Sequence, residues 1–191
     1  MKWSILILTM TERAALLERL MDFLRPQVQK FPDVEIFTLI STRSRTVGEQ
    51  RQEMLNRARG EYVCFVDDDD LVSPDYVATI RPLLDGVDYI GFPVHTFRDG
   101  KFYGAAYHSL KFGKWDSSKT YAERDISHLN PIRRELALRA PMEGGFGEDG
   151  RWASRLRQLQ IVKTEHVVPE VMYFYHIRTH KPEMEPVNSC A

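Results

Sequence analysis

The chain has 191 residues and a formal net charge of −1, with 43% hydrophobic and 28% charged residues. This size and composition are typical of one globular domain with a sizeable core. The charge balance excludes a general attraction to nucleic acid or anionic membranes, and the longest apolar stretch near the N-terminus, residues 5–8, is too short to span a bilayer.

The first 85 residues alternate between strand-like and helix-like patterns. Short apolar runs predict buried strands over residues 3–9, 34–40 and 62–66. Leucines at helical spacing predict a helix between the first two strands, with Thr11 as its N-cap. This alternation predicts an α/β fold with a mostly parallel central sheet and helices on both faces.

Two further helices have clear start signals. Thr46 and Glu49 form a capping box, and the helix behind them is expected to bury Val47 and to end with Gly60 at the C′ position. Ser73 precedes a proline and an aspartate, which predicts the N-cap of the next helix.

The second half of the chain has shorter and more aromatic runs. Strands are predicted over residues 89–92, 93–97, 102–108, 126–130, 160–167 and 171–176. Asn130 and Pro131 are expected to open a short helix, and a glycine-rich loop at 144–147 precedes a longer helix that begins at Glu148. Residues 182–191 read as a loose C-terminal tail.

Four consecutive aspartates, Asp67 to Asp70, follow the third predicted strand. Ligands bind at this carboxyl edge in open α/β sheets, and adjacent carboxylates suit Mg²⁺ or Mn²⁺ bridged to substrate phosphates. A helix dipole would favour one or two acids here, but not four. An EF-hand is excluded because the loop lacks a glycine at its sixth position and a glutamate at its twelfth. The segment therefore predicts a metal site.

Glu148 and Asp149 lie beside the glycine-rich loop. Such acids are often only partners of the helix dipole, but an acid on a rigid helix next to a permissive loop also suits a general base. Arg51, together with Arg43 and Arg45, is either a solvated surface group or a ligand for a diphosphate.

Histidines offer a further possible metal ligand. His176 follows an apolar run and is either a satisfied strand-end histidine or a third ligand added to the aspartates. His128, His166 and His180 are weaker candidates on the same reasoning. Cys64 lies in a predicted buried strand far from Cys190, so a disulfide is not expected and a reducing compartment fits.

Taken in order, these segments resemble a GT-A-type glycosyltransferase, closest to family 2. Residues 4–9 resemble the first strand, 48–51 and 58–63 the second helix and the start of the third strand, 65–74 the segment with the DxD motif, and 145–149 the ED motif. The resemblance covers residues 3–160.

The resemblance implies a Rossmann-like sandwich that transfers a sugar from a nucleotide-sugar donor, with a UDP-sugar expected, to an acceptor hydroxyl with inversion. Residues 1–181 would form a single domain, in which 1–92 bind the nucleotide sugar and 93–181 face the acceptor. A short enzyme of this kind is similar to phage-encoded glycosyltransferases, so the expected location is the cytoplasm of a bacterial or phage-infected cell.

By the same resemblance, Asp69 would hold Mn²⁺ or Mg²⁺, and Asp67 would contact the donor ribose or the metal. Asp149 would be the base, Glu148 would orient the acceptor or donor sugar, and His176 is similar in position to a C-terminal metal-binding histidine. The residues expected at the donor are Thr9, Arg13, Arg43, Arg51, Asp67 and Asp68.

The sequence leaves the acceptor open between a saccharide, a small molecule and a hydroxymethylated DNA base. A DNA acceptor would need local basic patches, for which the candidates are Arg133, Arg134 and Arg139, or Arg151, Arg155 and Arg157. Many relatives have an acidic loop after the second strand, whereas residues 41–45 here carry arginines, which puts the donor base in doubt.

Three rival functions remain. A nucleotidylyltransferase would need a glycine-rich loop after the first strand, but residues 9–13 contain no glycine. A phosphatase of the haloacid dehalogenase type carries its acids after the first strand rather than the third. A catalytically weak module that binds a nucleotide sugar or a metal is the non-enzymatic alternative. The oligomeric state cannot be read from the sequence.

Overall fold

The computed structural model describes residues 1–117 and 121–178. Within these residues a six-stranded sheet has the order β10-β5-β9-β3-β1-β2. Its strands are β1 (Trp3–Thr9), β2 (Val34–Ile40), β3 (Tyr62–Phe65), β5 (Tyr89–Gly91), β9 (Ile132–Arg133) and β10 (Glu165–Val167). β1 runs parallel to both β2 and β3, and β9 is antiparallel to its neighbours, so the expected α/β fold with a mostly parallel sheet is confirmed.

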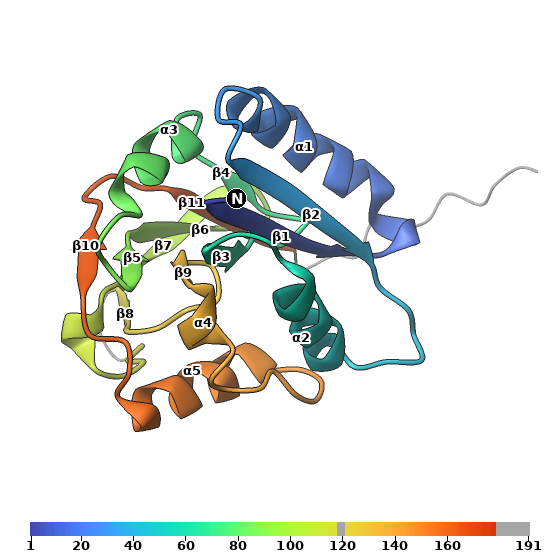
Figure 1. The fold of residues 1–191 in the computed structure, drawn as a ribbon. Coiled ribbons are helices and arrows are strands. Elements are labelled where there is room, and N and C mark those ends of the chain that lie inside the picture. The colour runs from blue at the N-terminus through green and yellow to red at the C-terminus, as the bar shows by residue number, and fades with distance from the viewer. Residues whose placement is uncertain (118–120, 179–191) are drawn as a thin grey trace, which may run out of the picture.

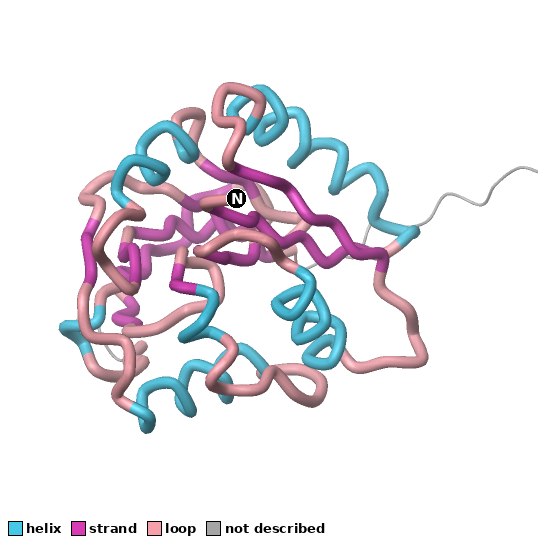
Figure 2. Tube along the Cα trace, in the orientation of Figure 1, coloured by secondary structure: helices cyan, strands magenta, loops and turns pink. Residues whose placement is uncertain are grey.

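Helices cover both faces of this sheet, as Figures 1 and 2 show. They are α1 (Ala14–Val28), α2 (Val47–Arg57), α3 (Tyr76–Ile80), α4 (Arg134–Ala137) and α5 (Glu148–Leu159), with 3₁₀ turns η1 (Thr11–Arg13), η2 (Arg81–Leu83) and η3 (Leu110–Phe112). α1 and α3 lie on one side, and α2, α4 and α5 lie on the other (Figure 1).

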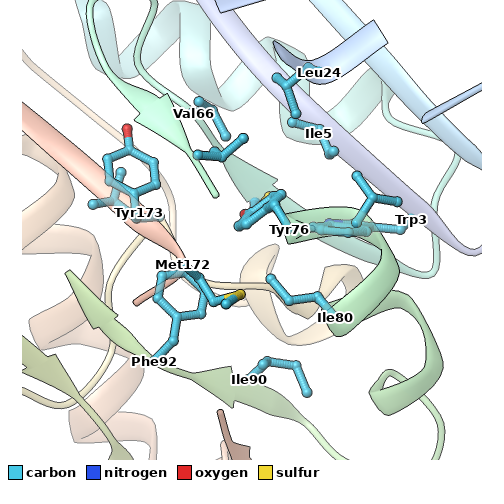
Figure 3. Packing of buried hydrophobic residues seen from close by; sticks show 14 of the residues in the cluster. Trp3, Ile5, Leu24, Val66, Tyr76, Ile80, Ile90, Phe92, Met172 and Tyr173 are labelled. Carbon is cyan, nitrogen blue, oxygen red and sulfur yellow. The ribbon is translucent and has the colours of Figure 1, made fainter. Parts of the chain in front are cut away.

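Two hydrophobic clusters fill the spaces between these layers. Because successive side chains of a strand point to opposite faces, Ile5 and Ile7 of β1 enter the cluster under α1 and α3, while Leu6 enters the one against α2 and α5. A strand buried on both faces needs an unbroken apolar run, and this explains the sequence of β1. Figure 3 shows the first cluster, in which Trp3 and Tyr76 make an aromatic contact at 5.4 Å.

A second sheet packs beside the first and has the order β4-β11-β6-β7-β8 in the described part of the chain. Its strands are β4 (Leu71–Val72), β6 (Pro93–Arg98), β7 (Lys101–His108), β8 (Ala122–Arg124) and β11 (Tyr173–Ile177). The strands predicted over residues 93–97 and 102–108 are confirmed as β6 and β7, which form an antiparallel hairpin. β4 directly follows the four aspartates and pairs with β11, so this sheet is connected to the acidic segment.

Several start and stop signals read from the sequence are wrong. Thr11 lies inside η1, so α1 begins only at Ala14, and this tighter turn has Met10 as its cap without a side-chain bond. The capping box of Thr46 and Glu49 is confirmed, but Val47 points outward and is 37% exposed. Gly60 is not a left-handed C′ residue.

Glycine is required at position 60 for a different reason. A Cβ there would lie 2.5 Å from the backbone nitrogen of Ser4, so only glycine lets the chain approach β1 this closely. Ser73 is not an N-cap either, because β4 precedes it and α3 starts at Tyr76. The Ser73 carbonyl instead accepts hydrogen bonds from the Tyr76 backbone and from the Gln27 side chain.

The second half was predicted less well. Residues 126–130 form no strand, since pairing with β3 is made by β9 (Ile132–Arg133) and the short helix follows only at α4. The strand predicted over 160–167 is reduced to β10, and the one predicted over 171–176 is shifted to β11. The predicted tail, residues 182–191, lies outside the described residues.

His108 is buried where the two sheets meet. It is 2% exposed, stacks on Phe92, and places Nδ1 2.5 Å from Oδ1 of Asn130. Burial lowers the pKa of His108 to about 3, although the bond to Asn130 opposes this shift. The folded protein therefore holds a neutral imidazole at this position.

We expect this histidine to make the fold sensitive to mild acid. Its folded pKa lies below the ordinary value of 6.5, so its contribution to stability is complete above pH 6.5 and is lost as the pH falls toward 3. Between pH 7 and pH 5 it should remove up to about 2 kcal/mol from the free energy of unfolding. Urea titrations at both pH values measure this drop in the free energy of unfolding. The drop should be smaller for His108→Gln than for the parent protein. The control His166→Gln, at an exposed position, should show the same drop as the parent protein.

Candidate active site

The four aspartates form a tight turn in which the amide of Asp70 donates to the carbonyl of Asp67 over 3.1 Å. Their side chains divide into two pairs. Those of Asp68 and Asp70 are 2% and 0% exposed, whereas those of Asp67 and Asp69 are 28% and 30% exposed. Two carboxylates can therefore reach a ligand, and the other two hold the turn in place.

Asp68 is bound from the end of β1. The hydroxyl of Thr9 donates to its Oδ2 over 2.6 Å, and Nη2 of Arg13 lies 2.7 Å from its Oδ1. Burial raises the pKa of Asp68 in spite of these two partners. This buried contact joins the ends of β1 and β3. Because the Thr9 and Asp68 side chains are engaged in it, they are not free to bind a nucleotide-sugar donor. Arg13 also reaches Asp69 over 2.6 Å and is 35% exposed, so it borders the open part of the turn.

Asp70 is bound from the second sheet. The hydroxyl of Tyr173 donates to Oδ2 over 2.7 Å and also accepts from the amide of Asp67, while the amide of His176 donates to Oδ1. Burial raises the pKa of Asp70 well above its ordinary value. Sequence analysis missed Tyr173, which lies in the hydrophobic cluster of Figure 3. A tyrosine in a core strand needs a polar partner for its hydroxyl, and this was the available signal.

Arg51 joins the acidic turn to the start of α5. Its Nη2 lies 2.6 Å from Oδ1 of Asp67 and its Nη1 lies 2.6 Å from Oε1 of Glu148. The guanidinium also lies over the ring of Phe65, and Arg51 as a whole is 8% exposed. The sequence suggested Arg51 as a diphosphate ligand. In the structure its guanidinium is already paired with two carboxylates.

His128 continues this series of charges. Its Nδ1 lies 3.3 Å from Oδ2 of Asp149 and its Nε2 lies 3.8 Å from Oδ2 of Asp67. The ring is buried, and neither nitrogen makes a well-aligned hydrogen bond within the described residues. Glu148, Arg51, Asp67, His128 and Asp149 therefore form a chain of alternating acidic and basic groups, which we call the charge chain.

The charge chain keeps two acids ionised. Burial alone would raise the pKa of Asp149, but the nearby His128 outweighs this effect and holds it well below the ordinary value. For Asp67, burial is likewise outweighed by Arg51 and His128, and its pKa is also well below normal. The Asp149 side chain is 24% exposed whereas that of His128 is 8% exposed, so Asp149, like Asp67, is open to a ligand.

The loop before α5 is held by an arginine. Arg151 donates to the carbonyls of Glu143, Gly145 and Phe146, and Gly147 has a φ of +81°, which only glycine adopts without strain. Phe146 is fully exposed at the tip of this loop. The predicted glycine-rich loop is therefore confirmed, but it is clamped onto α5.

The remaining predicted donor and metal residues are more scattered. Arg43 pairs with Glu12 on the surface, and Arg45 pairs with Glu53, so neither is brought to the aspartates by these contacts. Among the described residues no group of three or more His, Cys, Asp and Glu side chains is placed to hold a metal ion. Asp67, Asp69 and His176 thus do not form a ready-made metal cage.

Asp69 and His176 nevertheless have suitable chemistry for a metal shared with a substrate. Nδ1 of His176 donates a hydrogen bond to the carbonyl of Phe174 over 2.9 Å, and this leaves Nε2 as the nitrogen that can bind a metal. Burial lowers the pKa of His176, and the nearby Arg19 and Arg178 lower it further. Mg²⁺ and Mn²⁺ commonly take few protein ligands and complete their shell with water and phosphate oxygens, so the open Asp69 carboxylate fits this use.

Most of the arginines proposed as basic patches form hydrogen bonds within the protein. Five of them bond to carboxylates or carbonyls, through Arg133 to Glu61, Arg134 to Leu55, Arg151 to the loop before α5, Arg155 to Glu143, and Arg157 to Asp125. These contacts reduce the positive charge that they offer to a nucleic acid.

The fold and the two acidic segments at its edge define a GT-A-type glycosyltransferase fold. Residues 18–140, more than half of the chain, match the family model described as glycosyl transferase family 2. The chain belongs to this family. A comparison with curated protein sequences finds no match.

Solved structures with the same fold include S. aureus TarS and a mannosyltransferase. S. aureus TarS 1–349 in complex with UDP-GlcNAc superimposes with a TM-score of 0.65 at 16% identity, covering 95% of this chain and 60% of that one. The mannosyltransferase PcManGT from Pyrobaculum calidifontis, in complex with GDP-Man and Mn²⁺, gives 0.54 at 17% identity, covering 91% and 56%. This chain therefore spans about three fifths of the length of either neighbour. None of the helices in the described part of the chain has the length and hydrophobicity that a membrane span requires.

We expect Arg51 to be essential for folding of this site. Replacing it with glutamine leaves Asp67 and Glu148 without their partner, and loss of one member of a buried ion pair costs about 3–5 kcal/mol. Arg57→Gln on the same helix breaks an exposed pair with Glu53 and a contact with the Phe37 ring, and it should cost less than about 1 kcal/mol. Equilibrium unfolding in urea measures both, and equal losses would contradict the importance of the buried pair.

Proposed function

We propose that this chain transfers a sugar from a nucleotide-sugar donor to an acceptor hydroxyl, with inversion at the anomeric carbon. The observation that carries the proposal is the meeting of two acidic segments at one imidazole. Asp67 from the turn after β3 and Asp149 from the start of α5 lie 3.8 Å and 3.3 Å from the two ring nitrogens of His128. In this proposal Asp67 would be the donor-side acid and Asp149 the acceptor-side acid.

In this proposal the donor diphosphate lies over the open part of the acidic turn. Asp69 and Nε2 of His176 would hold Mn²⁺ or Mg²⁺, and Asp67 would contact the ribose. The bound metal would neutralise the negative charge that develops on the leaving diphosphate. Arg13 lies 2.6 Å from Asp69 and adds positive charge at the same place.

Asp149 would act as the general base. Its carboxylate is partly exposed and stays ionised at neutral pH, because His128 balances its charge. The acceptor hydroxyl gives its proton to Asp149 while its oxygen attacks the anomeric carbon from the face opposite the diphosphate, which leaves with the bonding electron pair. Glu148 is 5% exposed and paired with Arg51, so it would act mainly by fixing the position of its neighbour.

A UDP-sugar is the first donor to test, because a neighbour with the same fold was solved with UDP-GlcNAc. GDP-mannose is the second, since another neighbour binds it together with Mn²⁺. A saccharide or small-molecule acceptor is favoured over a hydroxymethylated DNA base, because most of the arginines considered for DNA are engaged within the protein.

We expect metal binding to depend on donor binding. Mn²⁺ alone should shift the melting temperature little, because the described residues form no metal cage, whereas Mn²⁺ with UDP should raise it by mass action. EDTA should reverse the increase. A full increase with UDP in the presence of EDTA would show that the nucleotide binds without a metal, and the assignment of Asp69 and His176 would then be wrong.

Two substitutions should separate donor binding from transfer. Asp69→Asn should abolish the joint effect of Mn²⁺ and UDP in calorimetry. Asp149→Asn should leave that binding intact and reduce transfer by about 100-fold or more, the usual contribution of a general base. Asp75→Asn, an exposed acid on the same segment, is the control for both. Near-normal turnover in Asp149→Asn would require another base, and donor binding without turnover in the parent protein would favour the binding-module alternative.

A further inference from the structure

Arg124 lies at the end of β8 and was not identified from the sequence. In the pairing of β8 with β7 it is opposite His108, and its backbone carbonyl accepts a hydrogen bond from Ser109. The guanidinium carbon lies 4.3 Å from the centre of the Trp115 ring. This contact fixes the plane of the guanidinium group against an aromatic surface.

Trp115 places this arginine beside the proposed base. Its Nε1 donates to the carbonyl of Ile126 over 2.9 Å, which orients the indole. A Cβ built on Gly150 would lie 3.5 Å from the indole ring, so the ring packs directly against the first turn of α5. Gly150 follows Asp149 in the sequence. The stacked pair of Arg124 and Trp115 therefore adjoins the acceptor side of the site.

Tyr175 of β11 borders the same region from the second sheet and is 40% exposed. Burial lowers the pKa of Arg124, and the nearby Asp149 and Tyr175 oppose this shift by favouring its charged form. Arg124 also acts through its charge on Tyr175, whose pKa is raised mainly by burial and by the acidic turn. Arg124 is thus close enough to Asp149 and Tyr175 for their charges to act on it.

The charge of Arg124 is not matched by a close carboxylate. Arg13, Arg51 and Arg157 each lie within salt-bridge distance of an acid, whereas Arg124 forms no salt bridge among residues 1–117 and 121–178. Asp149 is the acid whose charge acts on Arg124, and it is already paired with His128. A partly buried cation without a paired anion is unfavourable, and this cost is removed when a ligand supplies the anion.

We propose that Arg124 recognises an anionic group, a carboxylate or a phosphate, carried by the substrate next to Asp149. This inference rests on the proposed function and adds a substrate class to it. The planar guanidinium can donate two parallel hydrogen bonds to either group, and Trp115 keeps it oriented for this. The anion comes either from the acceptor or from the donor sugar, because the site borders both.

The acceptor source is tested on protein saturated with Mn²⁺ and UDP, so that the diphosphate position is filled. Glucose 6-phosphate, glucuronate and glucose are titrated separately, and binding is followed by NMR. We expect at least one anionic sugar to bind about tenfold more tightly than glucose, the usual value of a charged hydrogen bond. Arg124→Gln should abolish the difference, and Arg124→Lys should retain part of it.

The donor source is tested by comparing UDP-glucuronate with UDP-glucose in the presence of Mn²⁺. A preference for UDP-glucuronate that disappears in Arg124→Gln would place the anion on the donor sugar. Arg98→Gln is the matched control for both tests, because Arg98 also stacks on an aromatic ring, 3.7 Å from Tyr103, and is exposed. It should leave every affinity unchanged.

The inference is overturned if the parent protein shows no preference for an anion in either comparison, or if the preference survives in Arg124→Gln. The parent measurements and Arg124→Lys decide the matter even if Arg124→Gln does not fold. Failure of the proposed function would have a different signature, since the parent protein would then bind no nucleotide sugar or would bind one without transferring its sugar. An unchanged affinity for UDP with no anion preference removes only the role of Arg124.

Discussion

The arrangement of the site depends on one buried guanidinium. Arg51 lies between Asp67 and Glu148, which come from a strand end and a helix start that are distant in the sequence. Without a cation these acids would repel each other, and a buried unpaired carboxylate is costly. Because Glu148 is fixed by this pair, its neighbour Asp149 is fixed as well. His128 then links Asp149 back to Asp67, so the charges balance only when β3, α2 and α5 are all in place.

The two sheets contribute different things to this balance. The parallel sheet supplies the edge at which the acidic turn lies, and the joined Thr9 and Asp68 side chains close that edge from inside. The second sheet supports the turn from the other side through Tyr173 and its bond to Asp70. Two of the four carboxylates therefore hold the turn, and this leaves Asp67 and Asp69 partly exposed in a fixed geometry.

Much of the first half of the fold could be predicted from the sequence, because buried strands and capped helices are set by local patterns. β1, β2 and the capping box of α2 are examples, and the fold class followed from their alternation. Residues 126–130 could not be predicted, since whether an apolar segment pairs is decided by its neighbours in space, and there β9 takes the place beside β3. For the site, the types of residue were visible, but not their partners. The sequence does not reveal that Arg51 is enclosed by acids, nor that Tyr173 reaches back to Asp70, because both contacts join segments far apart along the chain.

The start of α2 has a consequence for how this protein can vary. Gly48 donates its amide to the carbonyl of Gly144, and a Cβ at position 48 would lie 2.6 Å from the backbone of Glu143. The helix that carries Arg51 is thus seated directly on the base of the loop that precedes α5, and a larger residue there would push the two apart. The tip of the same loop touches little, and Phe146 is fully exposed. Substitutions can therefore accumulate at the tip at almost no cost to folding, whereas the root of the loop admits hardly any change.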